Sequence, residues 1–322
     1  MALSEFELID RFFNREVFQR GQGVILGIGD DCALLNLRHG EQLAVSMDTM
    51  VSGVHFPVDA DAEDIGYRLL ASNLSDLAAM GAEPVWFTLA MTLPEVKEHW
   101  LEGFVSGLSI LAQEHHLALV GGDTTKGPLT LTVQVHGRIP LGQALRRDGA
   151  LAGDKIYVSG TLGDAAAGLP LALSPPELTT DYQRYLLSRF YRPSPRVEHG
   201  RLLRPYASAA VDISDGLLAD LGHICKRSHM GAELDLDLLP MSEALLASGD
   251  RAYVESLALS GGEDFELCFT VNPADEEQML RELERLHVPL TCIGTITHRT
   301  GIRLLRNNAE VEGPERLGFR HF

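Results

Sequence analysis

Short apolar runs that alternate with stretches of helical periodicity dominate the first half of the chain, and this alternation predicts a mixed α/β fold. Residues 62–80 and 95–115 carry apolar side chains at helical spacing, as Leu70, Leu74 and Leu77 show. Between and around these helices we expect strands at 24–28, 43–47, 86–93, 117–120 and 129–139.

A segment rich in turn residues, 139–154, interrupts this alternation and predicts a domain boundary. A second α/β unit follows it, with a helix that begins near Gly216. We therefore expect two domains, 1–145 and 146–322, and the chain's 322 residues with 45% hydrophobic content can bury both cores. The other elements expected in the second domain are strands at 155–160, 209–213, 232–238, 266–271 and 292–296 and helices from 164 and at 273–286.

The charge balance limits the possible partners. The chain has 45 acidic and 27 basic residues, a formal net charge of -18, which argues against a nucleic-acid backbone as a partner. An anionic substrate would therefore need help from metal ions. Ser4 and Glu7 form a capping-box pattern at the start of an amphipathic helix, and the sequence predicts neither a signal peptide nor a membrane span.

The four cysteines have no spacing that suggests a zinc site. Each has apolar neighbours, so we interpret them as reduced thiols in the core of a cytoplasmic protein. They are Cys32, Cys225, Cys268 and Cys292.

Aspartates recur at the ends of the apolar runs. Asp48, Asp123 and Asp212 each close such a run, and the pair Asp30–Asp31 follows another in the motif GIGDD. Because ligands of α/β sheets bind beyond the carboxyl ends of strands, we expect these acids to converge on one crevice. Turns and helix caps are the alternative role for each acid taken alone.

Two further aspartates extend this set. Asp76 lies in a predicted helix, and Asp215 follows Asp212 by three residues, where Ser214 or Asp215 can equally cap the helix that begins near Gly216. Taken together, the carboxylates are the hard oxygen ligands that Mg²⁺ prefers beside a polyphosphate. The sequence contains no P-loop, no G-x-S-x-G motif and no HExxH motif. LSGGE (259–263) looks like an ABC-transporter signature, but that signature functions together with a P-loop, which is absent here.

Six motifs in a fixed order resemble those of the thiamine-monophosphate kinases: GIGDDCALL, SMDTMVSGVHF, NLSDLAAMGAEP, GGDTTKG, DISDGL and LSGGEDFEL. The likeness extends from about residue 4 to the C-terminal GFRHF. That family shares a superfamily with aminoimidazole ribonucleotide synthetase, selenophosphate synthetase and the hydrogenase maturation protein HypE. The resemblance implies a two-domain fold, a homodimer, and transfer of the ATP γ-phosphoryl group to thiamine monophosphate, giving thiamine diphosphate.

The resemblance also implies roles for individual residues. It assigns the first domain to ATP, Mg²⁺ and dimer formation, and the second to completion of the nucleotide and substrate site. The expected ligands of several Mg²⁺ ions are Asp31, Ser46, Met47, Asp48, Asp76, Asp123, Asp212 and Asp215. The expected ATP contacts are Gly122, Asp123, Arg147 and Ser214. The expected contacts to thiamine monophosphate are His55, Glu263 and Phe319.

Several of these assignments have alternatives. Met47 stands where the family pattern has Thr, so only its carbonyl can ligate a metal, and Phe319 replaces a larger or hydroxylated aromatic. Arg146 can take the place of Arg147, Asp264 can take that of Glu263, and spacing alone makes His55 a packed loop residue. These positions depend on the resemblance.

The implied chemistry needs no catalytic side chain. The acceptor phosphate oxygen is already anionic, so positioning and charge neutralisation suffice without a general base. Two other functions stay open: a different ATP-using reaction of the superfamily, or a nucleotide sensor without turnover. A reactive N-terminal Cys with Lys, or a C-terminal Cys, would favour the selenophosphate or HypE reactions, and the sequence has neither.

Overall fold

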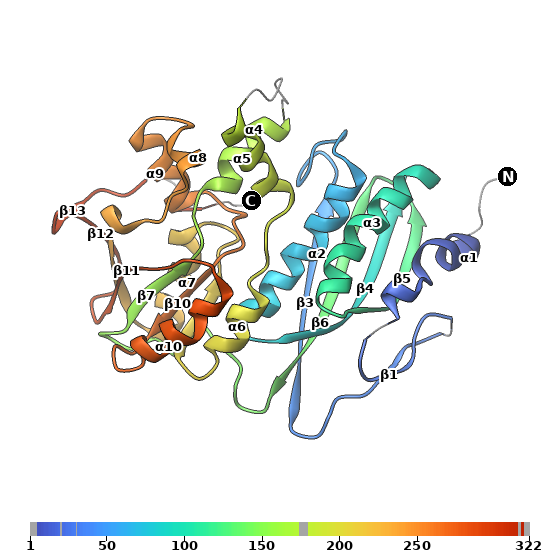
Figure 1. Ribbon diagram of the computed structural model, residues 1–322, viewed down its shortest axis with the longest axis horizontal. Coiled ribbons are helices and arrows are strands. Elements are labelled where there is room, and N and C mark those ends of the chain that lie inside the picture. The colour runs from blue at the N-terminus through green and yellow to red at the C-terminus, as the bar shows by residue number, and fades with distance from the viewer. Residues whose placement is uncertain (1–4, 20, 30, 174–179, 315–316, 319–322) are drawn as a thin grey trace. The chain divides into compact units, whose positions relative to one another are not determined.

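The computed structural model describes residues 5–19, 21–29, 31–173, 180–314 and 317–318. The chain forms two compact units. The first comprises Met1–Leu77 and Ala82–Gly142, and the second comprises Ala78–Gly81 and Gln143–Phe322 (Figure 1). The expected mixed α/β class is confirmed, since helices and sheets occur in both units.

The first unit is built on a four-stranded sheet with the order β3-β6-β4-β5. β3 pairs with β6 over eleven residues, and only the β4–β5 pair is parallel. Helices α2 and α3 lie over one face of this sheet (Figure 1). The elements are α1 Glu5–Leu8, β1 Val24–Leu26, β2 Leu34–Leu35, β3 Glu41–Val51, α2 Ala62–Ala79, β4 Glu83–Leu93, α3 Glu98–Glu114, β5 Ala118–Lys126 and β6 Thr130–Pro140.

The core of the first unit follows the predicted periodicity. Leu70, Leu74 and Leu77 of α2 are buried, as helical spacing predicts. On β6, Leu131 and Val133 are buried two residues apart, as in a strand with one covered face. On the edge strand β3, every second side chain lies toward α2, and the alternate apolar residues are exposed, among them Leu43, Val45 and Met47.

Two glycines set the distance between α2 and α3. A Cβ atom on Gly107 of α3 would lie 1.9 Å from the carbonyl oxygen of Glu63. A Cβ atom on Gly66 of α2 would lie 2.1 Å from the carbonyl oxygen of Phe104. The two helix backbones therefore touch where side chains would otherwise separate them.

The second unit contains a seven-stranded sheet in the order β13-β12-β9-β11-β7-β10-β8, parallel only between β12 and β9. Its strands are β7 Lys155–Ser159, β8 Ala207–Asp212, β9 Gly231–Asp235, β10 Leu267–Val271, β11 Leu290–Thr297, β12 Gly301–Arg306 and β13 Ala309–Val311. Its helices are α4 Asp164–Leu173, α5 Asp181–Tyr191, α6 Val197–Leu203, α7 Leu217–Ser228, α8 Glu243–Leu246, α9 Arg251–Ser260 and α10 Glu276–Leu283.

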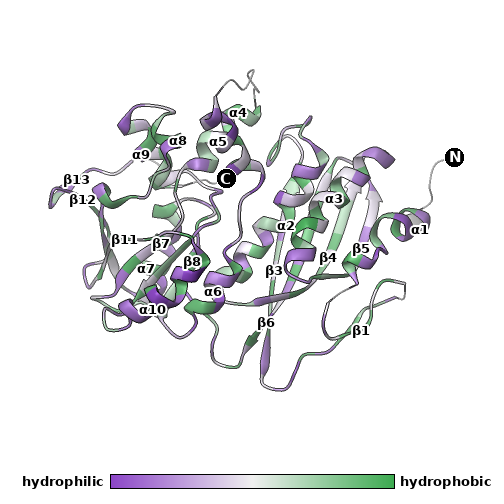
Figure 2. Cartoon of the chain, in the orientation of Figure 1, coloured by the Kyte–Doolittle hydropathy of each residue, from purple (hydrophilic) through white to green (hydrophobic). Residues whose placement is uncertain are grey.

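The central strands of this sheet are apolar on both faces. All five residues of β10 are buried, and Ile156, Val158 and Val211 of the neighbouring strands pack in the same core. Figure 2 shows the contrast between such strands and surface helices: β4 is mostly apolar, whereas α10 is mostly polar.

Two predicted strand ends were wrong. β3 runs to Val51 and β5 to Lys126, so Asp48 and Asp123 lie inside strands. The backbone pairing of β3 with β6 and of β5 with β4 continues past the apolar runs. Polar side chains are tolerated there because both are edge strands, which are only partly covered. Asp212, in contrast, is the last residue of β8, as expected.

The prediction also missed several short elements. Helix α5, Asp181–Tyr191, was missed although Thr180 and Gln183 form a capping box at its start. The strands β12 and β13 and the helices α6, α8 and α9 were not expected either. Helix α1 is present where a helix was predicted, although Ser4 of the proposed capping box lies outside the described residues. Among the described helices, none is both long and apolar enough to cross a bilayer.

Replacing Gly107 with Ala is expected to lower the thermal midpoint of unfolding by several degrees, because the methyl group pushes α2 and α3 apart at a cost of about 1–3 kcal/mol. Differential scanning calorimetry measures the effect. Gly222→Ala on α7 is the matched control, since no atom lies within 4 Å of its Cβ position, and Ala there should leave or raise the midpoint. Equal midpoints for the Gly107 variant and the native protein would contradict the close-contact argument.

Candidate active site

A cluster of oxygen ligands lies between β3 and α2 in the first unit. Ser46 donates a hydrogen bond to Asp76 Oδ2 (2.5 Å), and the Asp48 amide donates to Asn73 Oδ1 (3.1 Å). The pKa of Asp48 rises to about 6, because the side chain is largely buried and the negative charge of Asp76 is close, although a hydrogen bond from Ser72 opposes the rise. This side of β3 therefore concentrates negative charge that a cation would neutralise.

The donor chemistry of this cluster fits a hard divalent cation. Two carboxylates and a hydroxyl are the oxygen ligands that Mg²⁺ accepts, with water or phosphate completing the shell. Within the described residues, no group of three or more His, Cys, Asp or Glu side chains is close enough to hold a metal alone. Met47 lies on the opposite side of β3, and its side chain is exposed, so only its carbonyl oxygen is available as a ligand.

The first unit also contains a cavity of about 460 Å³. Three more of the predicted site residues line it: Asp31, Gly122 and Asp123. Cys32 also lines it and is exposed, so the prediction of a core thiol was wrong for this residue. All four cysteines are free, and Cys225 and Cys268 are buried as expected. The apolar part of the cavity wall comes from Ile9, Phe13, Ile28, Leu89, Met91 and Leu119.

Asp48 and Asp123 lie at nearly the same level of the sheet, because Asp48 pairs with Val133, Val133 with Leu89, and Leu89 with Gly122. They lie on β3 and β5, the two edges of the sheet, and three interstrand steps separate these strands by about 14 Å. At this distance, Asp48 and Asp123 cannot ligate the same ion. β3 and β5 nevertheless run in the same direction, since β3 and β4 are both antiparallel to β6 and β4 is parallel to β5. The convergence of these acids on one crevice therefore stays a prediction.

His55 has a structural role in its loop. The ring atom Nδ1 accepts a hydrogen bond from the Val51 amide at the end of β3 (3.0 Å). The neutral ring therefore carries its hydrogen on Nε2. The loop also closes through a hydrogen bond from the Gly53 amide to the carbonyl oxygen of Phe56 (2.8 Å). The packing role that spacing favoured for His55 is thus present.

In the second unit, the DISDG motif forms the turn between β8 and α7. A single oxygen, Oδ2 of Asp220, accepts hydrogen bonds from the amides of Ser214, Asp215 and Gly216 (3.0, 3.0 and 3.1 Å). Gly216 is the N-cap of α7, and no side chain caps it. The predicted capping role of Ser214 or Asp215 was therefore wrong.

Asp220 was missed by the sequence analysis. Its acidic side chain in the first turn of α7 was the available signal, since anions favour helix N-termini. The side chain is buried, and burial raises its pKa to about 6, although the three amide donors oppose the rise. Because Asp220 satisfies the amides of the turn, the side chains of Ser214 and Asp215 need not do so.

A second turn, 261–266, is hydrogen-bonded to the DISDG turn. The Glu263 amide donates to the carbonyl oxygen of Ser214 (2.8 Å), and the Phe265 amide donates to that of Ile213 (2.9 Å). A Cβ atom on Gly262 would lie 2.4 Å from the Ser214 carbonyl oxygen. The glycine thus allows close approach to the chain's own backbone, and the structure brings Asp212, Ser214, Asp215 and Glu263 into one region.

The backbone of this second turn is strained. Glu263 has a φ of 71° and Phe265 a φ of 51°, in the left-handed region that L-residues seldom adopt. Each such residue costs about 1–3 kcal/mol and persists where surrounding contacts enforce it. The side chain between them, Asp264, supplies such contacts.

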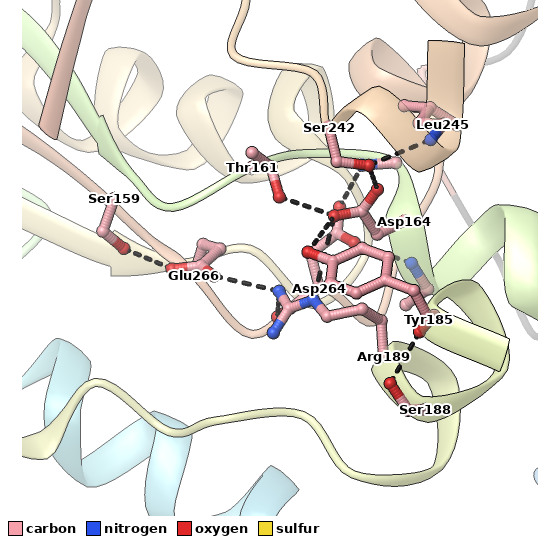
Figure 3. Close-up of polar contacts among 12 residues, drawn as sticks. Ser159, Thr161, Asp164, Tyr185, Ser188, Arg189, Ser242, Leu245, Asp264 and Glu266 are labelled. Carbon is pink, nitrogen blue, oxygen red and sulfur yellow. Dashed lines mark hydrogen bonds and ion pairs between the residues drawn. The ribbon is translucent and has the colours of Figure 1, made fainter. Parts of the chain in front are cut away.

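A buried polar network surrounds Asp264 (Figure 3). Its carboxylate accepts hydrogen bonds from the amides of Gly163 (2.6 Å) and Ala165 (3.0 Å) at the start of α4. Next to it, Glu266 is fully buried and accepts from Arg189 (2.9 Å) and, through both oxygens, from Arg196 (2.6 and 2.5 Å). Both arginines are therefore committed to Glu266.

At the start of the second predicted domain, Arg146 and Arg147 have different roles. Arg146 forms two hydrogen bonds with Asp148, at 2.8 and 2.5 Å. Arg147 is exposed, and its carbonyl oxygen accepts a hydrogen bond from Ser228 (2.9 Å). Asp148 therefore pairs with the guanidinium group of Arg146 rather than with that of Arg147.

Phe319 and Asp30 lie outside the described residues. The nearby Gly318 is described, and its Cβ position would be 2.7 Å from the Asp215 carbonyl oxygen. The chain therefore passes directly by the DISDG turn one residue before Phe319. The predicted site residues thus fall into two sets, one in each unit.

Two family models match the chain. The model of the AIR synthase related protein, N-terminal domain, matches residues 29–139, and that of the C-terminal domain matches residues 152–306. The thiamine-monophosphate kinase of Salmonella typhimurium is 49% identical over 324 residues, covering 100% of this chain and 99% of the relative.

Solved structures agree with this relationship. The thiamine-monophosphate kinase of Stenotrophomonas maltophilia K279a is 51% identical, with a TM-score of 0.86, and the match covers 94% of this chain and 97% of that one. The structure of AaThiL complexed with AMPPCP and TMP is 31% identical, with a TM-score of 0.78, over 100% of this chain and 99% of that one.

The pKa of Asp264 gives a testable pH dependence. Burial raises this pKa from its ordinary 3.8 to about 7, against the opposing effect of Arg189 and the two amides, while the nearby Asp164 adds to the rise. The folded state thus holds the proton more tightly than the unfolded state. The stability that this group contributes is complete below pH 4 and is lost as the pH rises through 7.

Replacing Asp264 with Asn removes this titration. We expect the thermal midpoint of the Asn variant, relative to the native protein, to shift upward by roughly 3 °C or more between pH 4.5 and pH 8. Midpoints measured by circular dichroism at several pH values check this. A difference between the two proteins that stays constant over that range would contradict the raised pKa.

Proposed function

Because this chain belongs to the thiamine-monophosphate kinases of the AIR synthase related family, we propose that it transfers the γ-phosphoryl group of ATP to thiamine monophosphate. The products are thiamine diphosphate and ADP. The observation that carries this proposal is the full-length match to a kinase structure that holds AMPPCP and TMP together. The match to a named kinase at 49% identity over the same length supports it.

The reaction requires little from catalytic side chains. A phosphate oxygen of thiamine monophosphate attacks the γ-phosphorus, a new P–O bond forms there, and the bond to the β-phosphate oxygen breaks with its electron pair leaving on ADP. The attacking oxygen is anionic near neutral pH, so no general base is needed. The protein's task is to align two anions and offset their repulsion.

Several Mg²⁺ ions are part of the proposal. Ser46, Asp48, Asp76 and the Met47 carbonyl would hold one ion beside β3, where the carboxylates of Asp48 and Asp76 lie close enough to repel each other. The chemistry that bound Mg²⁺ supplies is charge neutralisation between phosphate groups. The remaining proposed ligands are Asp31 and Asp123 at the cavity of the first unit and Asp212 and Asp215 in the second unit.

The remaining proposed residues would contact the two substrates, ATP and thiamine monophosphate. ATP would meet Gly122, Asp123, Arg147 and Ser214. The pairing of Arg146 with Asp148 supports the choice of Arg147 over Arg146. Thiamine monophosphate would meet His55, Glu263 and Phe319. Of these, Glu263 has the strongest support, since its turn is joined to the one that carries Ser214.

We also propose a homodimer formed through the first domain, 1–145. On the outer side of β3, Leu43, Val45 and Met47 are 46%, 51% and 58% exposed and form an apolar stripe. Such a stripe on a sheet edge is typical of an interface and a liability when uncovered. Domain 146–322 would complete the nucleotide and substrate site. The free cysteines support a reducing, cytoplasmic location, and the acidic balance argues against a nucleic-acid partner.

The decisive experiment is a product assay. Purified protein with Mg²⁺, ATP and thiamine monophosphate should form thiamine diphosphate and an equal amount of ADP, measured by chromatography. Thiamine without a phosphate should give no product. ATP bound but not consumed would indicate a nucleotide sensor, and consumption only with another acceptor of the superfamily would overturn the choice of substrate.

Replacing Asp48 or Asp123 with Ala should reduce turnover at least about 100-fold while leaving the circular dichroism spectrum unchanged, because each removes one proposed metal ligand. Steady-state rates at saturating Mg²⁺ and ATP measure the loss. Glu102→Ala, an exposed acid on α3, is the matched control and should keep native activity. Near-native turnover in either Asp variant would refute its assignment as a ligand.

A further inference from the structure

The structure assigns a positioning role to Asp264. We propose that its buried carboxylate fixes the 261–266 turn and thereby holds Glu263 in the orientation that binds thiamine monophosphate. This inference rests on the proposed function and goes beyond it, because Asp264 itself would touch neither substrate nor metal. It replaces the earlier alternative, in which Asp264 could take the place of Glu263 as a direct contact.

The side chain of Asp264 is buried inside the protein. It is 1% exposed, and its two oxygens accept from two different amides at the start of α4, that of Gly163, the residue before the helix, at 2.6 Å and that of Ala165 at 3.0 Å (Figure 3). These are amides that the first turn of a helix leaves without an intrahelical partner. Asp264 therefore caps α4 from a distant part of the sequence and ties its own turn to that helix.

The residues on either side of Asp264 need this anchor. Glu263 and Phe265 both have positive φ, and their amides are bound to the DISDG turn. Two strained residues that flank a single anchored residue relax when that anchor is weakened. Since Glu263 precedes Asp264 directly, any relaxation moves the Glu263 carboxylate.

A second contact fixes the same residue through its backbone. Arg189 Nη2 lies 3.5 Å from the Asp264 carbonyl oxygen, and the same guanidinium donates to Glu266 at 2.9 Å. The turn is thus held from its side chain, its carbonyl group and its amides. Removing the side-chain contacts leaves the strained φ values supported by fewer restraints.

Asp164 provides a matched comparison within the same network. Its oxygens bind Ser242 and Thr161 at 2.5 Å each and Tyr185 at 3.3 Å, contacts that join α4 to α8 and α5. It is as buried as Asp264 and also ionisable, but its link to the 261–266 turn is indirect, through Arg189 Nε at 3.8 Å. A purely structural role predicts the same effect on catalysis from both residues, whereas positioning predicts a much larger effect from Asp264.

The experiment compares Asp264→Asn with Asp164→Asn at pH 8. In the first variant, the asparagine side chain has one acceptor oxygen for two amides, so one of them loses its partner. For this variant we expect KM for thiamine monophosphate to rise at least about tenfold, with KM for ATP and kcat within twofold of native. For Asp164→Asn we expect a lower thermal midpoint but KM values within twofold of native.

Two results would overturn the inference: an unchanged KM for thiamine monophosphate in Asp264→Asn, or an equal rise in Asp164→Asn. Hydrogen exchange of the native protein supplies a test that needs no variant. If Asp264 ties the turn to α4, the amides of Ala165 and Glu263 exchange through one common opening. Independent opening of the two amides would contradict the tie.

The two proposals fail in distinguishable ways. If the native protein forms no thiamine diphosphate, the proposed function falls, and the exchange experiment still decides whether Asp264 anchors the turn. If the native protein is active and the Asn variant keeps its KM, the function stands and the positioning role of Asp264 falls.

Discussion

Buried carboxylates that accept hydrogen bonds from main-chain amides are the interaction on which the second unit's candidate site depends. Asp220 holds the DISDG turn and Asp264 holds the adjoining 261–266 turn. An isolated carboxylate buried in protein is costly, and the amides offset that cost because they would otherwise lack partners. The anchors hold the backbone of both turns, while Ile213 and Phe265 pack their side chains in the interior.

The same network determines where positive charge is available for phosphate. Arg189 and Arg196 lie close to the candidate site, but Glu266 engages both. Arg146 is engaged by Asp148, and Arg147 stays exposed. A chain with a net charge of -18 that commits its nearby arginines to structural pairs needs another source of charge neutralisation. This is the physical reason to place cations beside its aspartates.

Sequence alone predicted the fold class, the long helices and most strands, because burial imposes a period of 3.6 or 2 on apolar residues. Leu70, Leu74 and Leu77 are the clearest case. It placed Asp48 and Asp123 at strand ends wrongly, since backbone pairing extends β3 and β5 past their apolar runs. It missed Asp220, whose place in the first turn of α7 was a signal, and the contacts of Asp264, because the partners of both are backbone amides, which every sequence contains.

The edge position of β3 connects the candidate metal cluster to the proposed dimer. Successive side chains of a strand point to opposite sides, so Ser46 and Asp48 lie toward Asp76 while Val45 and Met47 form the apolar stripe. A register slip of one residue against β6 would move Val45 and Met47 to the side of Asp76, and Asp48 to the side of the apolar stripe. The eleven-residue pairing with β6 therefore fixes the candidate ion site and the proposed interface together.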